Sequence, residues 1–333
     1  MRALVTGTSG FVGGAIGSHL RCRGWHVTGL SRGAPRPGAA DAAIRHDLRH
    51  PVPPGALPEA PHVVIHAAAL SAPWGDPDAF RRINVDGTRH AVDFARRAGA
   101  HLLLISSSSV LYAPGDQHDL PEAPAPETAA VNAYAATKRE AEDLVRRAGL
   151  PAAILRPRAV FGVGDTVLFP RIARAARMRL LPRLVRPDGE EAVGDLVSVD
   201  NLVRAVARAA ERRAAGILHL TDGAPVPMAA FVAGALEHVG LPGPALCVPA
   251  GAARRAAGML ERLSARTGWW EPPLTRFGVA VFSETKTFST ERADAVLGPP
   301  EVPTELALAR FTEWWRQGAQ LDDPAMGRVG TPP

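Results

Sequence analysis

The chain has 333 residues, of which 46% are hydrophobic and 21% are charged, and its formal net charge is +5. This composition is typical of a globular protein with one large and one smaller domain, and it excludes a mainly disordered chain. The basic residues are scattered among alanines and form no cluster with aromatic residues, so we expect no nucleic-acid surface. An anionic substrate or cofactor suits the charge better.

The chain shows no targeting or membrane segment. Its first residues, MRALVTG, contain no long apolar stretch, and no segment approaches about 18 uninterrupted apolar residues. Two cysteines, Cys22 and Cys247, have neither a metal-site spacing nor a disulfide framework. We therefore expect a cytoplasmic protein with two inert thiols, no transmembrane segment and no metal site.

A glycine turn near the N-terminus predicts a nucleotide site. An apolar strand over residues 2–6 runs directly into a turn that holds Gly7, Gly10 and Gly13, and a helix follows over residues 15–23. The first two glycines permit a tight turn and close approach of the backbone to a pyrophosphate, and the third permits close helix–strand packing. The N-terminus of the helix would then face the anion.

The second strand, over residues 25–30, indicates which dinucleotide binds. It ends at Ser31 and Arg32, where NAD-binding versions of this unit usually carry an acidic residue for the ribose hydroxyls. Arg32 can instead bind a 2′-phosphate, so we predict NADP(H) in preference to NAD(H). The alternative is an arginine that only extends into solvent at the strand end.

Further strands and helices alternate along the first half of the chain. Such alternation predicts an α/β fold with a doubly wound parallel Rossmann sheet, and a cofactor at the carboxyl ends of its strands. The expected strands are 43–46, 63–66, 102–106 and 152–155, and the expected helices are 78–97 and 132–147.

The pair Tyr134 and Lys138 is the strongest sign of catalysis. The chain has only two tyrosines and two lysines, and a tyrosine four residues before a lysine would arise by chance in roughly one per cent of such chains. Residues four apart share a helix face, and a nearby ammonium favours the ionised phenol. Tyr134 could then give a proton to a carbonyl oxygen. The alternative is an exposed tyrosine beside a solvated lysine.

Taken in order, these motifs resemble the extended short-chain dehydrogenase/reductase superfamily over most of the first 200 residues. The resemblance implies a Rossmann fold, a nicotinamide cofactor and a Ser–Tyr–Lys catalytic set. It rests on TGxxGxxG from Thr6, Asp47-Leu48, HAAA from His66, NVDGT from Asn84, SSSS from Ser106, YxxxK from Tyr134 and RPRAVFG from Arg156.

The resemblance also implies residue roles. Ser108, four residues before Tyr112, would hydrogen-bond the substrate carbonyl, with Ser107 and Ser109 as alternatives. Tyr134 would protonate the alkoxide, and Lys138 would bind the nicotinamide ribose while lowering the pKa of Tyr134. Asn84 would support the site without taking part in the chemistry. The implied cofactor-binding residues are Gly7, Ser9, Gly10, Phe11, Val12, Gly13, Arg32, Asp47, Leu48, Ala67, Ala68, Ala69, Ser106, Tyr134, Lys138, Pro157 and Val160. For Asp47 the alternative is a turn residue, and for the alanines simple packing.

The second half resembles the 3β-hydroxysteroid dehydrogenase-like branch, which includes bacterial 2-alkyl-3-oxoalkanoate reductases. The similar segments are ILHLTDGAPVP from Ile217, PPLTRFGVAVFS from Pro272, TFS from Thr287 and TEWW from Thr312. The resemblance implies an NADPH-dependent ketoreductase or dehydrogenase acting on a 3-oxo or 3-hydroxy group of an apolar substrate: a 2-alkyl-3-oxo acid, a polyketide-like ketone or a steroid. The alternatives are a sugar-nucleotide epimerase or dehydratase with bound NAD(P), and a non-catalytic NADP-binding sensor.

The resemblance suggests an NADP-binding domain of residues 1–160 and 196–222, a substrate domain of 161–195 and 223–320, a flexible tail of 321–333, and a homodimer. A helix over 251–263 is amphipathic; it would pack on the core, line a lipid-shaped pocket or touch a membrane surface. Trp269 and Trp270 are either core anchors or a pocket rim. Arg158 and Arg276 are the candidates for binding a substrate carboxylate.

Overall fold

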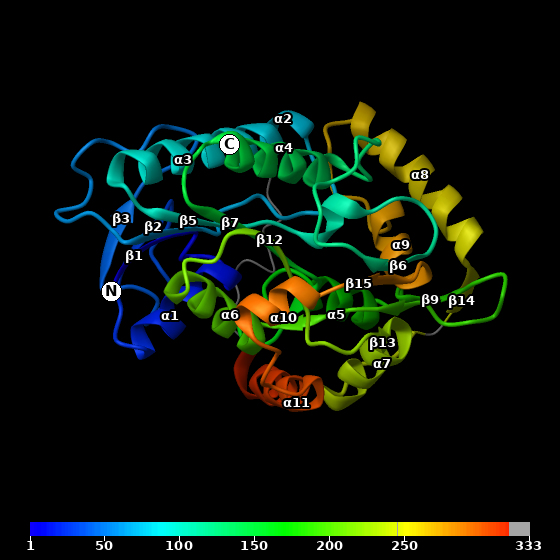
Figure 1. The fold of residues 1–333 in the computed structure, drawn as a ribbon. Helices are drawn as coiled ribbons and strands as arrows, with labels where there is room; N and C mark the ends of the chain where they lie inside the picture. The colour runs from blue at the N-terminus through cyan, green and yellow to red at the C-terminus, as the bar shows by residue number, and fades with distance from the viewer. Residues whose placement is uncertain (245, 320–333) are drawn as a thin grey trace.

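A seven-stranded parallel sheet forms the centre of the protein in a computed structural model that describes residues 1–244 and 246–319. The strand order is β12-β7-β5-β4-β1-β2-β3, which confirms the Rossmann arrangement (Figure 1). The order reverses between β1 and β4, and a cofactor binds at this switch point in such sheets. The strands are β1 (Arg2–Thr6), β2 (His26–Ser31), β3 (Ala42–Arg45), β4 (Val63–His66), β5 (His101–Ile105), β7 (Ala152–Pro157) and β12 (Gly216–Leu220).

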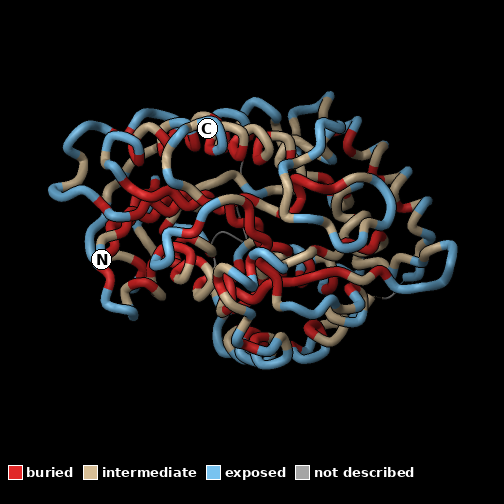
Figure 2. The backbone as a smooth tube through the Cα atoms, viewed as in Figure 1, coloured by how far each residue is buried: buried red, intermediate tan, exposed pale blue. Residues whose placement is uncertain are grey.

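Helices cover both faces of this sheet, so its central strands are buried throughout (Figure 2). Burial on both sides explains why β4 and β5 are nearly continuous apolar runs. Figure 1 shows one layer of helices above the sheet and another below it. The upper layer has α2 (Pro77–Phe80), α3 (Gly87–Ala98) and α4 (Ala133–Arg147), and the lower layer has α1 (Phe11–Cys22) and α6 (Val199–Glu211).

The predicted helix over residues 78–97 is interrupted in the structure. A π-helical segment, η1 (Arg81–Asp86), separates α2 from α3. The buried Asn84 lies in this segment and hydrogen-bonds to the backbone of Leu70 with both ends of its amide. Apolar periodicity alone does not predict this turn, because π-helical turns are rare, single-turn insertions within α-helices.

The remaining elements form a smaller part beside the carboxyl end of the sheet. One small sheet has the order β13-β10-β15-β6, and two further strand pairs are β8 with β11 and β9 with β14. These strands are β6 (Gln117–Leu120), β8 (Val160–Phe161), β9 (Pro182–Val185), β10 (Val193–Gly194), β11 (Val197–Ser198), β13 (Val226–Pro227), β14 (Leu246–Pro249) and β15 (Lys286–Phe288). The helices are α5 (Phe169–Arg177), α7 (Met228–His238), α8 (Ala250–Arg266), α9 (Arg276–Ser283), α10 (Glu291–Leu297) and α11 (Thr304–Trp314), with the short segments η2 (Ser108–Leu111) and η3 (Trp315–Ala319).

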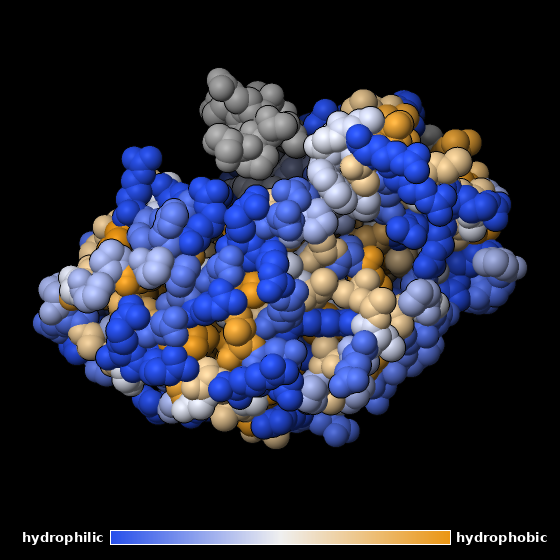
Figure 3. All heavy atoms as spheres, turned by 90° about the horizontal axis from the view of Figure 1, so that it is seen from above, coloured by the Kyte–Doolittle hydropathy of each residue, from blue (hydrophilic) through white to orange (hydrophobic). Residues whose placement is uncertain are grey.

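The predicted domain boundaries stay a prediction, and the predicted tail over 321–333 lies outside the described residues. Within the part of the chain that the structure covers, no helix is long and apolar enough to cross a membrane. Helix α8 buries Ala257 and Ser264 and exposes Met259 and Leu263. Hydrophilic residues dominate the face seen in Figure 3, with hydrophobic ones scattered among them. Contact with a membrane surface and dimerisation therefore also stay predictions.

Candidate active site

Helix α4 positions Tyr134 and Lys138 against the carboxyl end of β5. Asn132 precedes the helix, and its side-chain oxygen accepts a hydrogen bond from the backbone N–H of Ala135 at 2.8 Å. This N-cap fixes where the helix begins, and therefore which face Tyr134 and Lys138 occupy. The Lys138 ammonium is buried and donates a hydrogen bond to the carbonyl oxygen of Ile105 at 2.8 Å.

Burial raises the pKa of the Tyr134 phenol above its usual value. Hydrogen bonding by the hydroxyls of Ser107 and Ser71 acts to lower this pKa and opposes the rise only in part. Desolvation of the phenol outweighs the favourable contacts, and the Lys138 ammonium is engaged with Ile105. Lys138 is not among the causes that set this pKa, so the prediction that it lowers the pKa of Tyr134 stays a prediction.

The four consecutive serines point in different directions. Ser106 donates a hydrogen bond to Glu142 at 2.5 Å. The Oγ of Ser107 accepts from the backbone N–H of Ser109 at 3.2 Å and lies 2.9 Å from the Ser109 Oγ. Ser108 is buried, with its Oγ 3.5 Å from the hydroxyl of Tyr112. The structure thus brings Ser107 to Tyr134, and the catalytic role of Ser108 stays a prediction.

A buried ion pair lies next to Lys138 on the inner face of α4. Arg156 donates to Glu142 from Nε at 2.9 Å and from Nη2 at 2.6 Å, and both side chains are almost fully buried. Burial lowers the pKa of Lys138 to about 8, while the charge of Glu142 acts to raise it. Glu142 therefore helps to keep the ammonium charged near neutral pH.

Asn84 connects the loop after β4 to α4. Besides its two contacts with Leu70, its side-chain nitrogen donates to the Thr137 hydroxyl at 3.1 Å. Thr137 precedes Lys138 directly, so these hydrogen bonds join the loop after β4 to the turn of α4 that carries the lysine. The supporting role that the resemblance implied for Asn84 stays a prediction.

The glycine turn has the close packing that a dinucleotide cradle requires. A Cβ on Gly13 would stand 2.3 Å from the carbonyl oxygen of Gly7, and one on Gly7 would stand 2.9 Å from Cα of Ala68. Gly7 also has a positive φ of 76°. The hydroxyl of Thr6 accepts hydrogen bonds from the backbone of Ala67 and Ala68, at 3.1 and 3.0 Å. These residues fit a bound dinucleotide, because only glycine permits the turn, the helix and the alanine segment to approach this closely.

The structure places Arg32 and Asp47 near each other, beyond the ends of β2 and β3. Arg32 is exposed, and its charge contributes to lowering the pKa of Asp47. The largest cause of that lowered pKa is Arg49, whose guanidinium and backbone N–H both donate to the Asp47 carboxylate at 2.9 Å. Asp47 therefore stabilises the turn that contains Arg49. Its contact with adenine stays a prediction.

The other predicted cofactor residues lie around the same edge of the sheet. Ser9 is exposed in the glycine turn, and Phe11 is buried at the first position of α1, with Val12 half-buried beside it. Leu48 is buried, and the carbonyl oxygen of Leu48 accepts a hydrogen bond from His90 Nδ1 at 2.8 Å. The remaining members are half-buried Ala69 after β4, Gly10 before α1, Pro157 at the end of β7 and half-buried Val160 at the start of β8.

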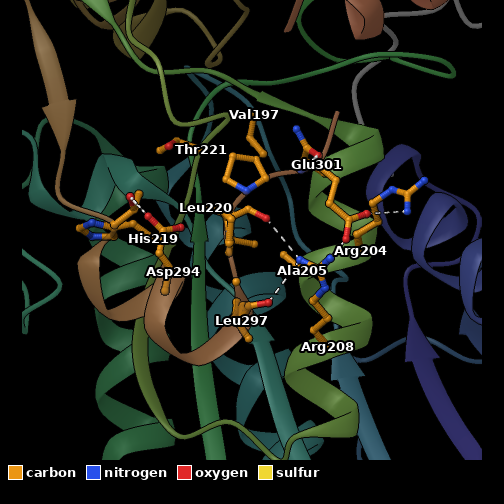
Figure 4. A pocket seen from close by; sticks show the side chains of 16 residues that line it. Val197, Arg204, Ala205, Arg208, His219, Leu220, Thr221, Asp294, Leu297 and Glu301 are labelled. Carbon is orange, nitrogen blue, oxygen red and sulfur yellow. Dashed lines mark hydrogen bonds and ion pairs between the residues drawn. The ribbon is translucent and has the colours of Figure 1, made fainter. Parts of the chain in front are cut away.

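Two cavities lie away from this edge. One lies between β12, α6 and α10, where Arg204 is paired with Glu301 at 2.9 Å (Figure 4). Its volume of about 30 Å³ is close to that of one water molecule, far below what a nucleotide needs. The other, of about 430 Å³, is lined by residues such as His26 and His62 at the amino ends of the strands. Neither contains Tyr134 or Lys138.

Trp74, on the loop that carries Ser71, forms an aromatic pair with Trp269, which follows α8. Trp74 contacts Trp269 with ring centroids 5.6 Å apart, and its indole N–H donates to the Ser264 hydroxyl at 2.9 Å. Trp269 thus joins the end of α8 to the loop after β4, whereas Trp270 is partly exposed. Of the two alternatives for Trp269, anchoring between segments is the one that these contacts support.

Sequence reasoning missed Ser71 and Glu142. Ser71 follows the HAAA motif at no recognisable spacing, so only the fold brings it to Tyr134. Glu142 is four residues after Lys138 and eight after Tyr134, which puts it on the same helix face. The spacing of four residues from Lys138 could therefore have identified Glu142 from the sequence.

Comparison with known proteins agrees with this geometry. The sequence profile of the NAD dependent epimerase/dehydratase family matches residues 3–219. A 3-diazoavenalumate denitrifying reductase of a Streptomyces species is 34% identical over 80% of this chain and 91% of its own length. A 2-alkyl-3-oxoalkanoate reductase of Stenotrophomonas maltophilia is 33% identical over 93% of this chain and 98% of its own.

A similar solved structure is MoeE5 in complex with UDP-glucose and NAD. It is 25% identical, covers 95% of this chain and 99% of its own, and superposes with a TM-score of 0.70. The profile match, the full-length relatives and the Rossmann site agree. The chain is therefore a member of the NAD-dependent epimerase/dehydratase family of extended short-chain dehydrogenases/reductases, and an NAD(P)-dependent oxidoreductase.

Proposed function

We propose that this oxidoreductase is an NADPH-dependent ketoreductase that interconverts a 3-oxo and a 3-hydroxy group on an apolar substrate. A 2-alkyl-3-oxo acid is the first candidate substrate. The observation that carries the proposal is the buried Lys138 ammonium one helical turn after Tyr134 on α4, which donates to the Ile105 carbonyl at 2.8 Å. The Ser107 hydroxyl acts to lower the pKa of the Tyr134 phenol. Support also comes from the named reductases among the relatives.

Tyr134 acts as the general acid in the reductive direction. Burial keeps its phenol protonated at neutral pH, because the pKa is raised above its usual value near ~10. A serine hydroxyl at Ser107 or Ser108 donates a hydrogen bond to the substrate carbonyl and orients it. The bound nicotinamide cofactor supplies the hydride. Tyr134 then transfers its proton to the substrate oxygen, and Lys138 stabilises the negative charge left near the phenolate.

The apolar substrate is supported by the name of one relative, a 2-alkyl-3-oxoalkanoate reductase. The preference for NADPH rests on Arg32, which is exposed at the end of β2, where no acidic residue takes its place.

Cofactor titration tests the cofactor preference. Fluorescence titration should show tighter binding of NADPH than of NADH, and Arg32→Gln should weaken NADPH binding by about ten- to a hundredfold while leaving NADH binding unchanged. A charge-assisted hydrogen bond of about 1.5–3 kcal/mol accounts for that range. Equal affinities in the unchanged protein would remove the role of Arg32, and tighter binding of NADH would assign NAD to the site.

Substrate turnover tests the reaction. NADPH consumption should be observed with a racemic 2-alkyl-3-oxo fatty acid or a 3-oxosteroid, and Tyr134→Phe should lower it by about 10²–10⁴-fold with NADPH affinity kept. Unchanged turnover in that variant would remove Tyr134 from the mechanism. A cofactor that is retained through purification, without net consumption, would favour the epimerase, and binding without any turnover would favour the sensor.

A further inference from the structure

Four cations are buried in the described part of the chain, and three of them have hydrogen-bond acceptors. Arg156 is paired with Glu142, Lys138 donates to the Ile105 carbonyl, and Lys286 donates to backbone oxygens and lies 3.3 Å from Glu284. The fourth is Arg158. It is only 4% exposed, yet its Nε and Nη2 are buried without any hydrogen-bond partner.

Arg158 lies one residue beyond β7, at the same end of the sheet as the serines. Its guanidinium is 5.4 Å from the ring centre of Tyr112, and the hydroxyl of Tyr112 is 3.5 Å from Ser108 Oγ. Ser108 adjoins Ser107, whose hydroxyl acts to lower the pKa of Tyr134. The buried guanidinium therefore lies on the same side of the molecule as the proposed proton donor, with Tyr112 and Ser108 between them.

Among the residues that the structure describes, no acid forms an ion pair with Arg158. Asp195 is close enough for Arg158 to oppose the rise in its pKa, but the two form no ion pair, and Asp195 accepts a hydrogen bond from the Phe288 backbone at 2.8 Å. Lys286 adds a second positive charge, 5.7 Å from the centre of the Tyr112 ring. A guanidinium buried without an acceptor is costly, and the face of one aromatic ring compensates for only part of the loss.

We propose that Arg158 binds the carboxylate of the substrate and thereby selects 3-oxo acids over neutral ketones. A planar guanidinium offers paired N–H donors that match the two oxygens of a carboxylate. The other sequence candidate is already occupied: Arg276 donates to the buried Glu261 from its side chain at 2.5 Å and from its backbone at 2.7 Å. The ketone in this inference rests on the proposed function. The carboxylate rests on the burial and the contacts of Arg158.

The first test compares an acid with its methyl ester in turnover. For Arg158→Met we expect kcat/KM for a 2-alkyl-3-oxo acid to fall by about 10- to 100-fold, the loss of charge-assisted hydrogen bonds, while kcat/KM for the ester changes little. Arg158→Lys should retain part of the acid preference, because it keeps the charge but not the planar fork. An equal loss for acid and ester in Arg158→Met would overturn the proposal and assign Arg158 a packing role.

The second test does not require turnover and therefore separates this proposal from the proposed function. Calorimetric titration of the NADP⁺-loaded protein with a saturated 2-alkyl fatty acid should give binding that Arg158→Met weakens by a similar factor. The matching primary amide should bind equally weakly to both proteins. Arg255→Met, which removes an exposed arginine of α8, is the charge control and should bind the acid normally. Acid binding that is unaffected by Arg158→Met would overturn the proposal even if the ketoreductase activity is confirmed.

Discussion

At the scale of single residues, the site is dominated by what burial does to ionisable groups. Tyr134 and Lys138 respond in opposite ways, because burial always favours the neutral form: the pKa of the phenol rises and that of the ammonium falls. Burying the Glu142–Arg156 pair costs desolvation energy. The charge of Glu142 opposes the fall in the pKa of Lys138.

The pKa of Lys138 leads to a pH prediction. Below its pKa of about 8 the ammonium is charged, and above it the charge that supports the phenolate is lost. The raised pKa of Tyr134 keeps the phenol protonated beyond that point. We therefore expect kcat/KM for ketone reduction to decline above about pH 8.

The measurement is a set of initial rates from pH 6 to pH 10, with NADPH affinity determined at each pH as the control. A rate that stays level up to pH 10 with unchanged affinity would contradict a role for the charge on Lys138.

At the scale of elements, close packing and helix ends decide where the side chains point. The π-helical η1 turns Asn84 toward Leu70 and Thr137, and the N-cap at Asn132 sets the first turn of α4. The contact of α1 with β1 depends on glycine, since a Cβ on Gly13 would overlap backbone atoms, which cannot move aside as a flexible side chain does.

Gly13→Ala is expected to destabilise the fold by about 1–3 kcal/mol or more and to weaken NADPH binding, because the added methyl group would push α1 away from the glycine turn. Urea unfolding and NADPH titration measure the two effects. The matched control is Gly234→Ala in α7, where a Cβ meets nothing within 4 Å. That variant should be neutral or slightly stabilising. Equal stability of both variants would show that α1 packs less closely than described.

At the scale of the whole molecule, the two-layered cover of helices isolates polar groups inside the sheet. His66 is fully enclosed between the hydroxyls of Thr6 and Thr88, at 2.9 and 3.1 Å. Burial, with a further contribution from Lys138, lowers the pKa of His66 to about 3. The folded protein therefore takes up fewer protons than the unfolded chain as the pH falls from about 6.5 to about 3, so acid favours unfolding.

We expect His66 to account for a loss of about 2 kcal/mol in the free energy of unfolding between pH 7 and pH 5. Urea unfolding of the unchanged protein and of His66→Gln at both pH values measures this share, because glutamine keeps hydrogen bonding but does not titrate. Comparing the two proteins cancels the opposing effect of Asp195, whose pKa burial raises to about 6. The same pH dependence in both would exclude His66 as its source.

The fold could be predicted from the sequence because its signals are local. Apolar strands, the Gly7–Gly10–Gly13 turn and the alternation with helices each depend on neighbours a few residues away, and the resulting parallel sheet is confirmed. The pairing of Tyr134 with Lys138 was predictable for the same reason, since helical spacing puts residues four apart on one face. The raised pKa of Tyr134 was not, because desolvation depends on everything packed around the phenol.

By itself, the sequence determined the Rossmann architecture and the superfamily of the enzyme. Only the tertiary structure decided that Ser107 and Ser71 influence the pKa of Tyr134, that Arg276 is held by Glu261, and that Nε and Nη2 of Arg158 are buried without a hydrogen-bond partner. The physical reason is that these contacts join distant segments. Helix and strand periodicity specify which face a residue occupies, whereas burial and hydrogen-bond partners depend on which other element packs against that face.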